Sequence, residues 1–139
     1  MLEVKTDTTL VDNEFITLKH VAEDDYIYHV IHKPISFETF REALDIGTKA
    51  LKDKGCVKWL SDDRKNGPLS EEQQKWAQED WIPRTIQTGW KFWAVVVPTD
   101  VISAGSLIPV INHLYEYGLR MAVFASQQEA VEWLKKMQE

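Results

Sequence analysis

Residues 57–98 decide the fold, and they read VKWLSDDRKNGPLSEEQQKWAQEDWIPRTIQTGWKFWAVVVP. This stretch contains five of the six tryptophans in the chain. It predicts a strand, a charged loop, a helix that Pro83 should end or kink near Ile82, and a second strand. A strand, a crossover helix and another strand form the repeating unit of a parallel sheet.

The two strands of this unit are apolar, and turn-forming residues separate them. Cys56–Leu60 is the first predicted strand. Trp90–Val97 is the second, and its almost wholly apolar character is typical of a strand covered on both faces. The loop Ser61–Pro68 combines Asp, Asn, Gly and Pro. Ser70 and Gln73 then have the spacing of a capping box, which predicts the start of the helix.

Before this unit, the chain predicts an antiparallel hairpin and an amphipathic helix. Phe15–Val21 and Tyr26–His32 are rich in β-branched and aromatic residues, and an acidic turn joins them. Ser36 is a good helix N-cap, and apolar residues recur at helical spacing as far as Leu51. Residues 1–13 are weakly patterned and are expected to form a loose arm or an edge strand.

After this unit, the chain predicts a helix, a strand and a final helix. Val101–Ile111 carries no charge, and regular helix is expected to begin close to Pro109. Leu119–Phe124 is the last predicted strand, and Ser126 opens the C-terminal helix. The predicted order is β-β-α-β-α-β-α-β-α. It indicates a single layered α/β domain, residues 1–139, with a mostly parallel sheet.

Composition limits the function classes. The chain has 139 residues, a formal net charge of −6 and 44% hydrophobic residues, as is ordinary for a globular domain. The negative charge argues against nucleic-acid binding, which needs clustered Lys and Arg. A single cysteine excludes an internal disulfide, and no secretory signal or membrane-spanning run is visible. We therefore expect a cytoplasmic protein without a membrane span.

The order of elements and several local marks resemble a known family. The marks are Asp63-Arg64 after the third strand, Trp81 with Pro83-Arg84, Gly89, the strand Trp93-Ala94-Val95-Val96, and Trp133-Leu134 in the last helix. With them, residues 14–138 resemble the SpoIIAA-like proteins of the STAS class (sulfate transporter and anti-sigma factor antagonist), in a divergent STAS-like branch. The resemblance implies a non-enzymatic module, without a cofactor, that binds a protein partner or senses a small molecule.

The resemblance also implies one candidate phosphorylation site. In anti-sigma factor antagonists, a Ser or Thr that opens the helix after the third strand is phosphorylated, and this switches partner binding. The corresponding residue here is Ser70. It follows a longer loop and precedes Glu71 and Glu72 rather than small residues.

The predicted binding site is one edge of the sheet, because ligands meet the loops beyond the carboxyl ends of parallel strands. Two such loops, Ser61–Leu69 and Pro98–Ser106, are expected to meet there. Trp76 and Trp81, the two tryptophans of the predicted helix, are five residues apart. On an α-helix this spacing places them about 140° apart, so they are not expected to share one buried stripe. One of them is expected to line a groove or a contact. The candidate residues are Asp62, Asp63, Arg64, Lys65, Ser70, Trp76, Trp81, Thr99, Ser103 and Ser106.

Three functions remain open. The first is a protein-interaction or sensing module that uses this edge, in which the uncharged Val101–Ile111 packs on the core or forms a lid or homodimer surface. The second is a binding domain for a small apolar or anionic ligand, held by a helix tryptophan with Leu107 and Ile108. The third, a small hydrolase, needs a base within hydrogen-bond reach of Ser61 or another hydroxyl.

The histidines do not predict a metal site. On a strand, His29 and His32 point to opposite faces, whereas His20 is expected to face His29 across the hairpin. Cys56 alone cannot build a thiolate site and is expected to be a buried structural thiol.

The acidic pair after the third strand does not predict a metal-binding or phospho-acceptor site, because the other residues of a phospho-receiver domain are not at the required places. Asp62 and Asp63 are expected to be solvated turn carboxylates. Asp63 is also expected to form an ion pair with Arg64 or Arg84.

Overall fold

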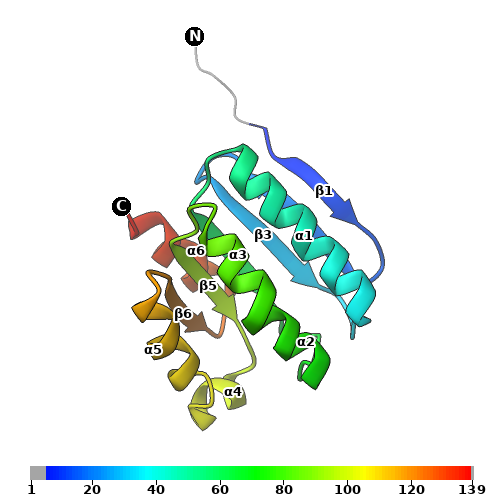
Figure 1. The fold of residues 1–139 in the computed structure, drawn as a ribbon, viewed down its shortest axis with the longest axis vertical. Helices are drawn as coiled ribbons and strands as arrows, with labels where there is room; N and C mark the ends of the chain where they lie inside the picture. The colour runs from blue at the N-terminus through cyan, green and yellow to red at the C-terminus, as the bar shows by residue number, and fades with distance from the viewer. Residues whose placement is uncertain (1–5, 139) are drawn as a thin grey trace.

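The computed structural model describes residues 6–138, and it contains one six-stranded sheet whose strands lie in sequence order (Figure 1). The strands are β1 (Thr8–Asp12), β2 (Ile16–Val21), β3 (Tyr26–Ile31), β4 (Lys58–Asp62), β5 (Phe92–Val96) and β6 (Arg120–Phe124). The first three pair antiparallel, and β3 through β6 pair parallel. The predicted α/β fold with a mostly parallel sheet is confirmed. Part of the predicted N-terminal arm is the edge strand β1, and residues 1–5 lie outside the described residues.

Helices connect the parallel strands and cover both faces of the sheet. They are α1 (Phe37–Asp53), α2 (Glu71–Trp76), the π-helical segment η1 (Ala77–Trp81), α3 (Ile82–Ile86), α4 (Thr99–Ala104), α5 (Ile108–Glu116) and α6 (Gln127–Lys136). Figure 1 shows α1, α2 and α3 in front of the sheet, with α6 behind it. Within residues 6–138, no helix has both the length and the apolar character that a membrane crossing requires.

Strand alternation divides the buried residues into two cores. The larger core lies under α1, η1, α3 and α5, and β3 contributes Ile27 and Ile31 to it. The smaller core lies under α6, where Ala130 and Leu134 pack on Leu60 of β4. The helices after β3, β4 and β5 share one face of the sheet, as expected when successive crossovers have the same hand.

Five tryptophans from the stretch 57–98 form one cluster in the larger core. The ring centroids of Trp90 and Trp93 are 5.0 Å apart, those of Trp59 and Trp81 are 5.2 Å apart, and those of Trp81 and Trp90 are 5.3 Å apart. Trp76 joins the cluster by stacking on Trp81 at 6.4 Å. The stretch that predicts the parallel unit therefore also supplies the centre of its core.

The expected 140° separation of Trp76 and Trp81 is wrong because the helix between them is not an α-helix. In η1, the backbone N–H of Ile82 bonds to the carbonyl of Ala77, five residues earlier. A π-helical turn of this kind brings residues five apart onto one face. The two indole planes consequently lie within 17° of each other.

Of the two outcomes expected near Ile82, an end or a kink of the helix, the end does not occur. The regular α-helix is instead interrupted by η1, which ends at Trp81. Helical backbone continues through Pro83 to Ile86, with Pro83 in the first turn of α3. Because proline has no backbone N–H, it fits where the widened turn has already interrupted the regular hydrogen-bond ladder.

Most of the other boundaries agree with the patterns that predict them. Ser36 caps α1, Ser126 caps α6, and α5 begins beside Pro109. The strand expected at Cys56–Leu60 begins and ends two residues later, as β4. The loop expected up to Ser106 contains a short helix, α4.

Candidate functional site

A cavity of about 720 Å³ lies at the carboxyl edge of the parallel strands, between the sheet and the helices. Small-molecule sites usually measure ~300–1,000 Å³. The apolar part of its wall includes Trp81, Trp93, Val101, Leu107 and Val110. Its ionisable lining residues are His29, Asp63, Arg64 and Asp100.

Both predicted loop segments reach this cavity. The segment after β4 contributes lining residues between Asp63 and Leu69, and the segment after β5 contributes lining residues between Pro98 and Ser106. Gly105, in the left-handed region at φ +67°, ends α4 and turns the chain toward α5. The two segments meet here because β4 and β5 are parallel neighbours.

The structure separates the predicted site residues into two groups. Those that line the cavity are Asp63, Arg64, Trp81 and Ser106. Those that do not are Asp62, Lys65, Ser70, Trp76, Thr99 and Ser103. Of the two apolar residues expected beside a helix tryptophan, Leu107 lines the cavity, whereas Ile108 is exposed outside it.

Ser70 serves as the N-cap of α2. Its Oγ accepts a hydrogen bond from the backbone N–H of Gln73, and the Gln73 side chain accepts one from the N–H of Ser70. The predicted capping box is therefore confirmed. A phosphoryl group on this oxygen would bring negative charge beside Glu71 and Glu72.

Asp62 is buried, so the expectation of a solvated carboxylate is wrong for this residue. It is 4% exposed, and its two oxygens accept hydrogen bonds from Nε and Nη2 of Arg64 at 3.0 and 2.8 Å. These hydrogen bonds raise the pKa of Arg64. The expected pairing of Asp63 with Arg64 is likewise wrong, and Arg84 pairs with carboxylates of α1 and η1.

Asp63 is instead bound to a buried histidine. Nε2 of His29 lies 2.8 Å from Oδ1 of Asp63, and the indole N–H of Trp59 donates to Nδ1 of the same ring at 3.0 Å. An N–H group can donate only to an unprotonated ring nitrogen, so Nδ1 is the acceptor and Nε2 carries the proton donated to Asp63. The ring is 2% exposed. Both of its nitrogens are therefore engaged.

The other histidines lie away from this network. Leu18, and not His20, is the cross-strand partner of His29, so the expected facing pair does not form. His20 bonds to Asp25, and His32 bonds to a threonine hydroxyl on the exposed side of the hairpin.

Ser61 lies beside His29 in the β3–β4 register and is fully buried. A serine hydrolase needs a ring nitrogen that accepts the serine proton. Here Trp59 and Asp63 occupy both nitrogens of His29, and Oγ of Ser61 accepts the indole N–H of Trp93 at 2.9 Å. Ser, His and Asp therefore line one cavity without forming the relay that the hydrolase hypothesis requires.

Two buried amide side chains hold the wall after β4 against the loop after β3. Oδ1 of Asn66 accepts the backbone N–H of Ile35 at 3.2 Å, and Nε2 of Gln73 donates to the carbonyl of Ile35 at 3.1 Å. Asn66 is 7% exposed and Gln73 is 5% exposed. The segment after β4 is thus held to the same residue from the middle of its loop and from the helix that follows.

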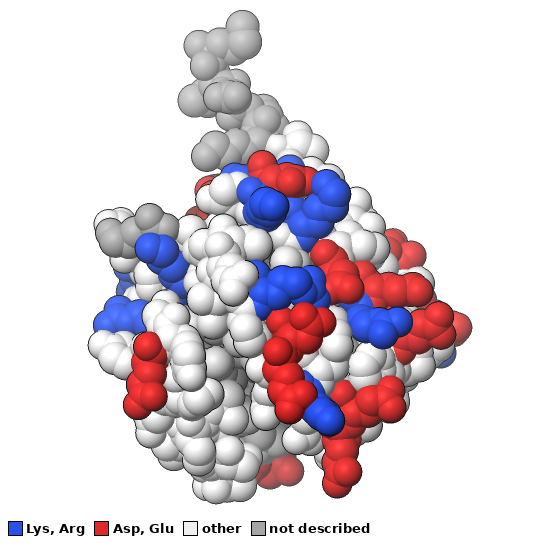
Figure 2. Space-filling view, in the orientation of Figure 1, with Lys and Arg blue, Asp and Glu red and all other residues white. Residues whose placement is uncertain are grey.

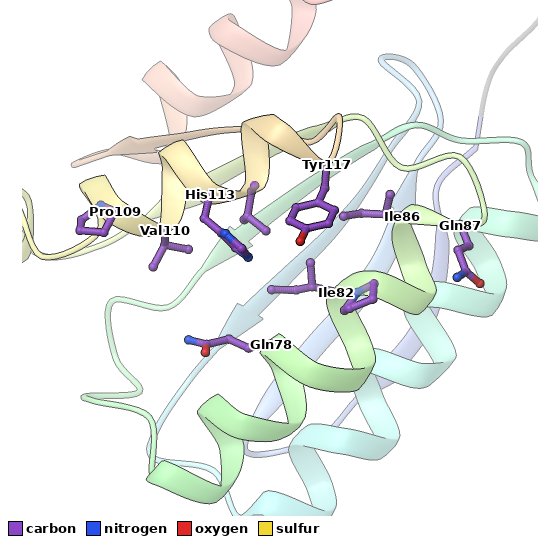
Figure 3. Close-up of a pocket in the computed structure, with 10 residues that line it drawn as sticks. Gln78, Ile82, Ile86, Gln87, Pro109, Val110, His113 and Tyr117 are labelled. Carbon is purple, nitrogen blue, oxygen red and sulfur yellow. The ribbon is translucent and has the colours of Figure 1, made fainter.

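A second hollow, of about 590 Å³, lies between α3 and α5. Figure 3 shows Ile82 of α3 facing His113 of α5, and Tyr117 just after α5, across it. Gln78, Ile82 and Val110 line both this groove and the larger cavity. The two hollows therefore share a wall.

The described residues that could offer metal ligands together are His20, Asp25 and Cys56, at the amino-terminal end of the parallel strands. Their ligand atoms lie within 4.8 Å of one another. The Cys56 thiol donates instead to the backbone carbonyls of Asp25 and Lys58 at 3.2 and 3.4 Å. Burial raises the pKa of this thiol to about 11, whereas metal binding needs the thiolate. The expectation of a buried thiol is confirmed.

Sequence reasoning missed His29 and Trp93 as site residues, and it considered Ser61 only as part of a loop and as a possible hydrolase nucleophile. One signal was available, because alternation along β3 places His29 on the same face as Ile27 and Ile31. A histidine between two core isoleucines is a buried polar group that needs partners. Those partners come from other strands, which a local pattern does not reveal.

No family model, curated protein or solved structure gives a significant match to this chain.

Proposed function

We propose that this chain is a non-catalytic binding module for a small, predominantly apolar molecule that occupies the cavity at the carboxyl edge of β4 and β5. The observation that carries the proposal is the cavity itself, with about 720 Å³ of space and mostly apolar walls. A concave apolar site with a few fixed polar groups is the usual form of a small-molecule site.

The polar groups of the cavity are held in place by the protein. His29 fixes the carboxylate of Asp63, and Trp93 donates to the hydroxyl oxygen of Ser61. Asn66 anchors the loop that follows. Groups fixed before binding lose little conformational entropy when a ligand arrives, which favours affinity.

The proposal includes a sensing role, which is what the resemblance to STAS-like proteins implies. α4 supplies Asp100 and Val101 to the cavity wall and contains no buried residue of its own. A ligand would therefore add contacts to a weakly packed helix. Ordering of α4 is the change by which occupancy would be signalled.

A titration of ¹⁵N-labelled protein with a library of small apolar compounds tests the proposal. The indole N–H signals of Trp81 and Trp93 report on the cavity wall, whereas Trp133 packs in the other core and serves as an internal control. Binding compounds are expected to shift the first two signals and leave the third unchanged. If the library moves neither cavity signal, the proposal is wrong.

A blocked variant sharpens this test. Val101→Phe combined with Val110→Phe places two larger side chains on the cavity wall, and compounds should then no longer bind. Ile46→Phe is the matched control, because Ile46 lies on α1 outside the cavity and is 43% exposed. Shifts that persist in the blocked variant would contradict the assignment of the cavity.

The surface of α4 and α5 favours a second function, docking of a protein partner or a second copy of the chain. Figure 2 shows a broad, mostly uncharged area at the lower left, where these helices lie in Figure 1. Ile108, Tyr115 and Tyr117 are 57%, 62% and 62% exposed. If the second copy is the occupant, sedimentation velocity should show a dimer that Ile108→Lys dissociates. A monomer at all concentrations eliminates the homodimer.

A further inference from the structure

We infer that the ligand of the cavity is an organic cation, with a protonated amine attached to its apolar body. This inference rests on the proposed function. It assigns the ammonium group to Asp63 and the apolar body to the tryptophan wall.

The charges that line the cavity support a cation. Arg64 is the cationic lining residue among residues 6–138, and two of its nitrogens bind Asp62. The carboxylates of Asp63 and Asp100 form no ion pair with a Lys or Arg of the described chain. The cavity therefore presents two carboxylates that no fixed cation neutralises.

Asp63 has the geometry of a ligand-binding carboxylate. Its Oδ1 accepts a hydrogen bond from the N–H at Nε2 of His29, and this bond orients the carboxylate. Within residues 6–138, its Oδ2 has no hydrogen-bond partner. The side chain is 31% exposed, so part of it is accessible from the cavity that it lines. An ammonium group can donate to this oxygen without displacing a protein contact.

The aromatic wall is suited to the same ligand. Trp81 and Trp93 both line the cavity, with ring centroids 5.8 Å apart and planes at 78°. Indole faces pack against apolar groups and also attract cations, because their electron density gives the face a negative potential.

An anionic ligand, one of the expectations from the sequence, fits this site poorly. An anion would have to bind at Arg64, whose charge is already compensated by Asp62 through two hydrogen bonds. The carboxylates of Asp63 and Asp100 line the same cavity and would repel it.

Three compounds with one shared body test the inference: 2-naphthylmethylamine, 2-naphthylmethanol and 2-naphthoate, which are cationic, neutral and anionic at pH 7. Their Kd values are measured from the indole N–H shift of Trp93 in the full chain. The amine is expected to bind at least about tenfold tighter than the alcohol, a difference of about 1.4 kcal/mol. The carboxylate should bind most weakly. Added salt should weaken binding of the amine and leave binding of the alcohol unchanged.

Single substitutions test which carboxylate produces the preference for the amine over the alcohol. Asp63→Asn retains an oxygen that accepts a hydrogen bond from His29 and removes the charge, so the amine should lose most of its preference over the alcohol. Asp100→Asn changes an exposed residue of the wall, should leave the fold intact, and should reduce the preference in part. Asp53→Asn, on α1 outside the cavity, is the matched control and should change nothing.

The outcomes separate the inference from the proposed function. If the alcohol binds as tightly as the amine, the inference is wrong and the cavity remains a site for neutral apolar molecules. An amine preference that survives both Asp63→Asn and Asp100→Asn would overturn the assignment to these carboxylates. If neither these three compounds nor the library shifts Trp81 or Trp93, the proposed function itself is wrong.

Discussion

The indole N–H of Trp59 donates a hydrogen bond to Nδ1 of His29 across 3.0 Å, and both side chains are buried. The other ring nitrogen of His29 donates to Asp63. One histidine therefore connects the centre of the tryptophan cluster to a carboxylate of the cavity. Trp59 and Asp63 both need His29 as a hydrogen-bond partner, because a buried polar group without a hydrogen bond costs about 1–3 kcal/mol of stability.

His29→Leu should lower the free energy of unfolding by about 2–5 kcal/mol. The substitution leaves the Trp59 donor without an acceptor and removes the donor to Asp63. Urea denaturation measures the change. The control is His32→Leu, on the exposed side of the hairpin, with an expected change within about 0.5 kcal/mol. Equal effects of the two substitutions would show that the network does not contribute.

Gly47→Ala should destabilise the protein even though alanine is the better helix former. A Cβ at Gly47 would overlap Cη2 of the Trp59 ring, which is fully buried and packed among other tryptophans. Alanine gains about 1 kcal/mol of helix propensity, but overpacking of a core typically costs ~1–3 kcal/mol. A net loss of stability in thermal unfolding is expected. Glu42→Ala, on an exposed position of α1, should be nearly neutral.

The pair Gly47→Ala and Trp59→Phe extends this test through a double-mutant cycle. The smaller phenylalanine ring should make room for the new methyl group. The double variant is therefore expected to be more stable than the sum of the single effects predicts. Additive effects would contradict the contact.

The tryptophan helix shows where a sequence pattern stops being informative. The capping box at Ser70 and Gln73 is a local feature, so it predicts the start of α2. The relation of Trp76 to Trp81 depends on the number of residues in each turn, and a spacing rule for α-helices gives the wrong face. The π-helical turn is favoured by packing of Trp81 in the core, which is a tertiary effect.

The site shows a similar limit. Parallel topology predicts that the segments after β4 and β5 meet, because that depends only on strand order. The pairing of His29 with Trp59 and Asp63, and of Ser61 with Trp93, depends on the register between strands. Register is a non-local property, so the predicted edge included Asp63 but not the histidine that orients it.

Asn66→Ala should loosen the cavity wall. The substitution removes the acceptor for the buried backbone N–H of Ile35, at a cost of about 1–3 kcal/mol. Hydrogen exchange should accelerate in residues 63–69. The control is Gln74→Ala, because Gln74 is exposed and its side-chain bond to Leu69 competes with water. Unchanged exchange in both variants would mean that Asn66 does not anchor the loop.

Alkaline pH should destabilise the protein through Cys56. Burial raises the pKa of this thiol from 9.0 to about 11, so the thiol ionises at lower pH in the unfolded chain than in the folded one. Between these values the unfolded state binds fewer protons, and stability falls as pH rises. Below pH 9.0 the protonated thiol makes its full contribution to the free energy of unfolding. As the pH rises from 9.0 toward 11, this contribution decreases by about 1.4 kcal/mol per pH unit.

The comparison of wild type with Cys56→Ala isolates this effect. Burial also raises the pKa of Tyr26 to about 12, and ionisation of Tyr26 has the same sign in both proteins, so it cancels in the difference. Urea denaturation from pH 8 to 10.5 should show that wild type loses about 2 kcal/mol more than the variant, as expected for a shift over this range. Parallel pH profiles would contradict a protonated, buried thiol. Slow alkylation of folded protein at pH 8, with fast alkylation in urea, would support it by an independent measurement.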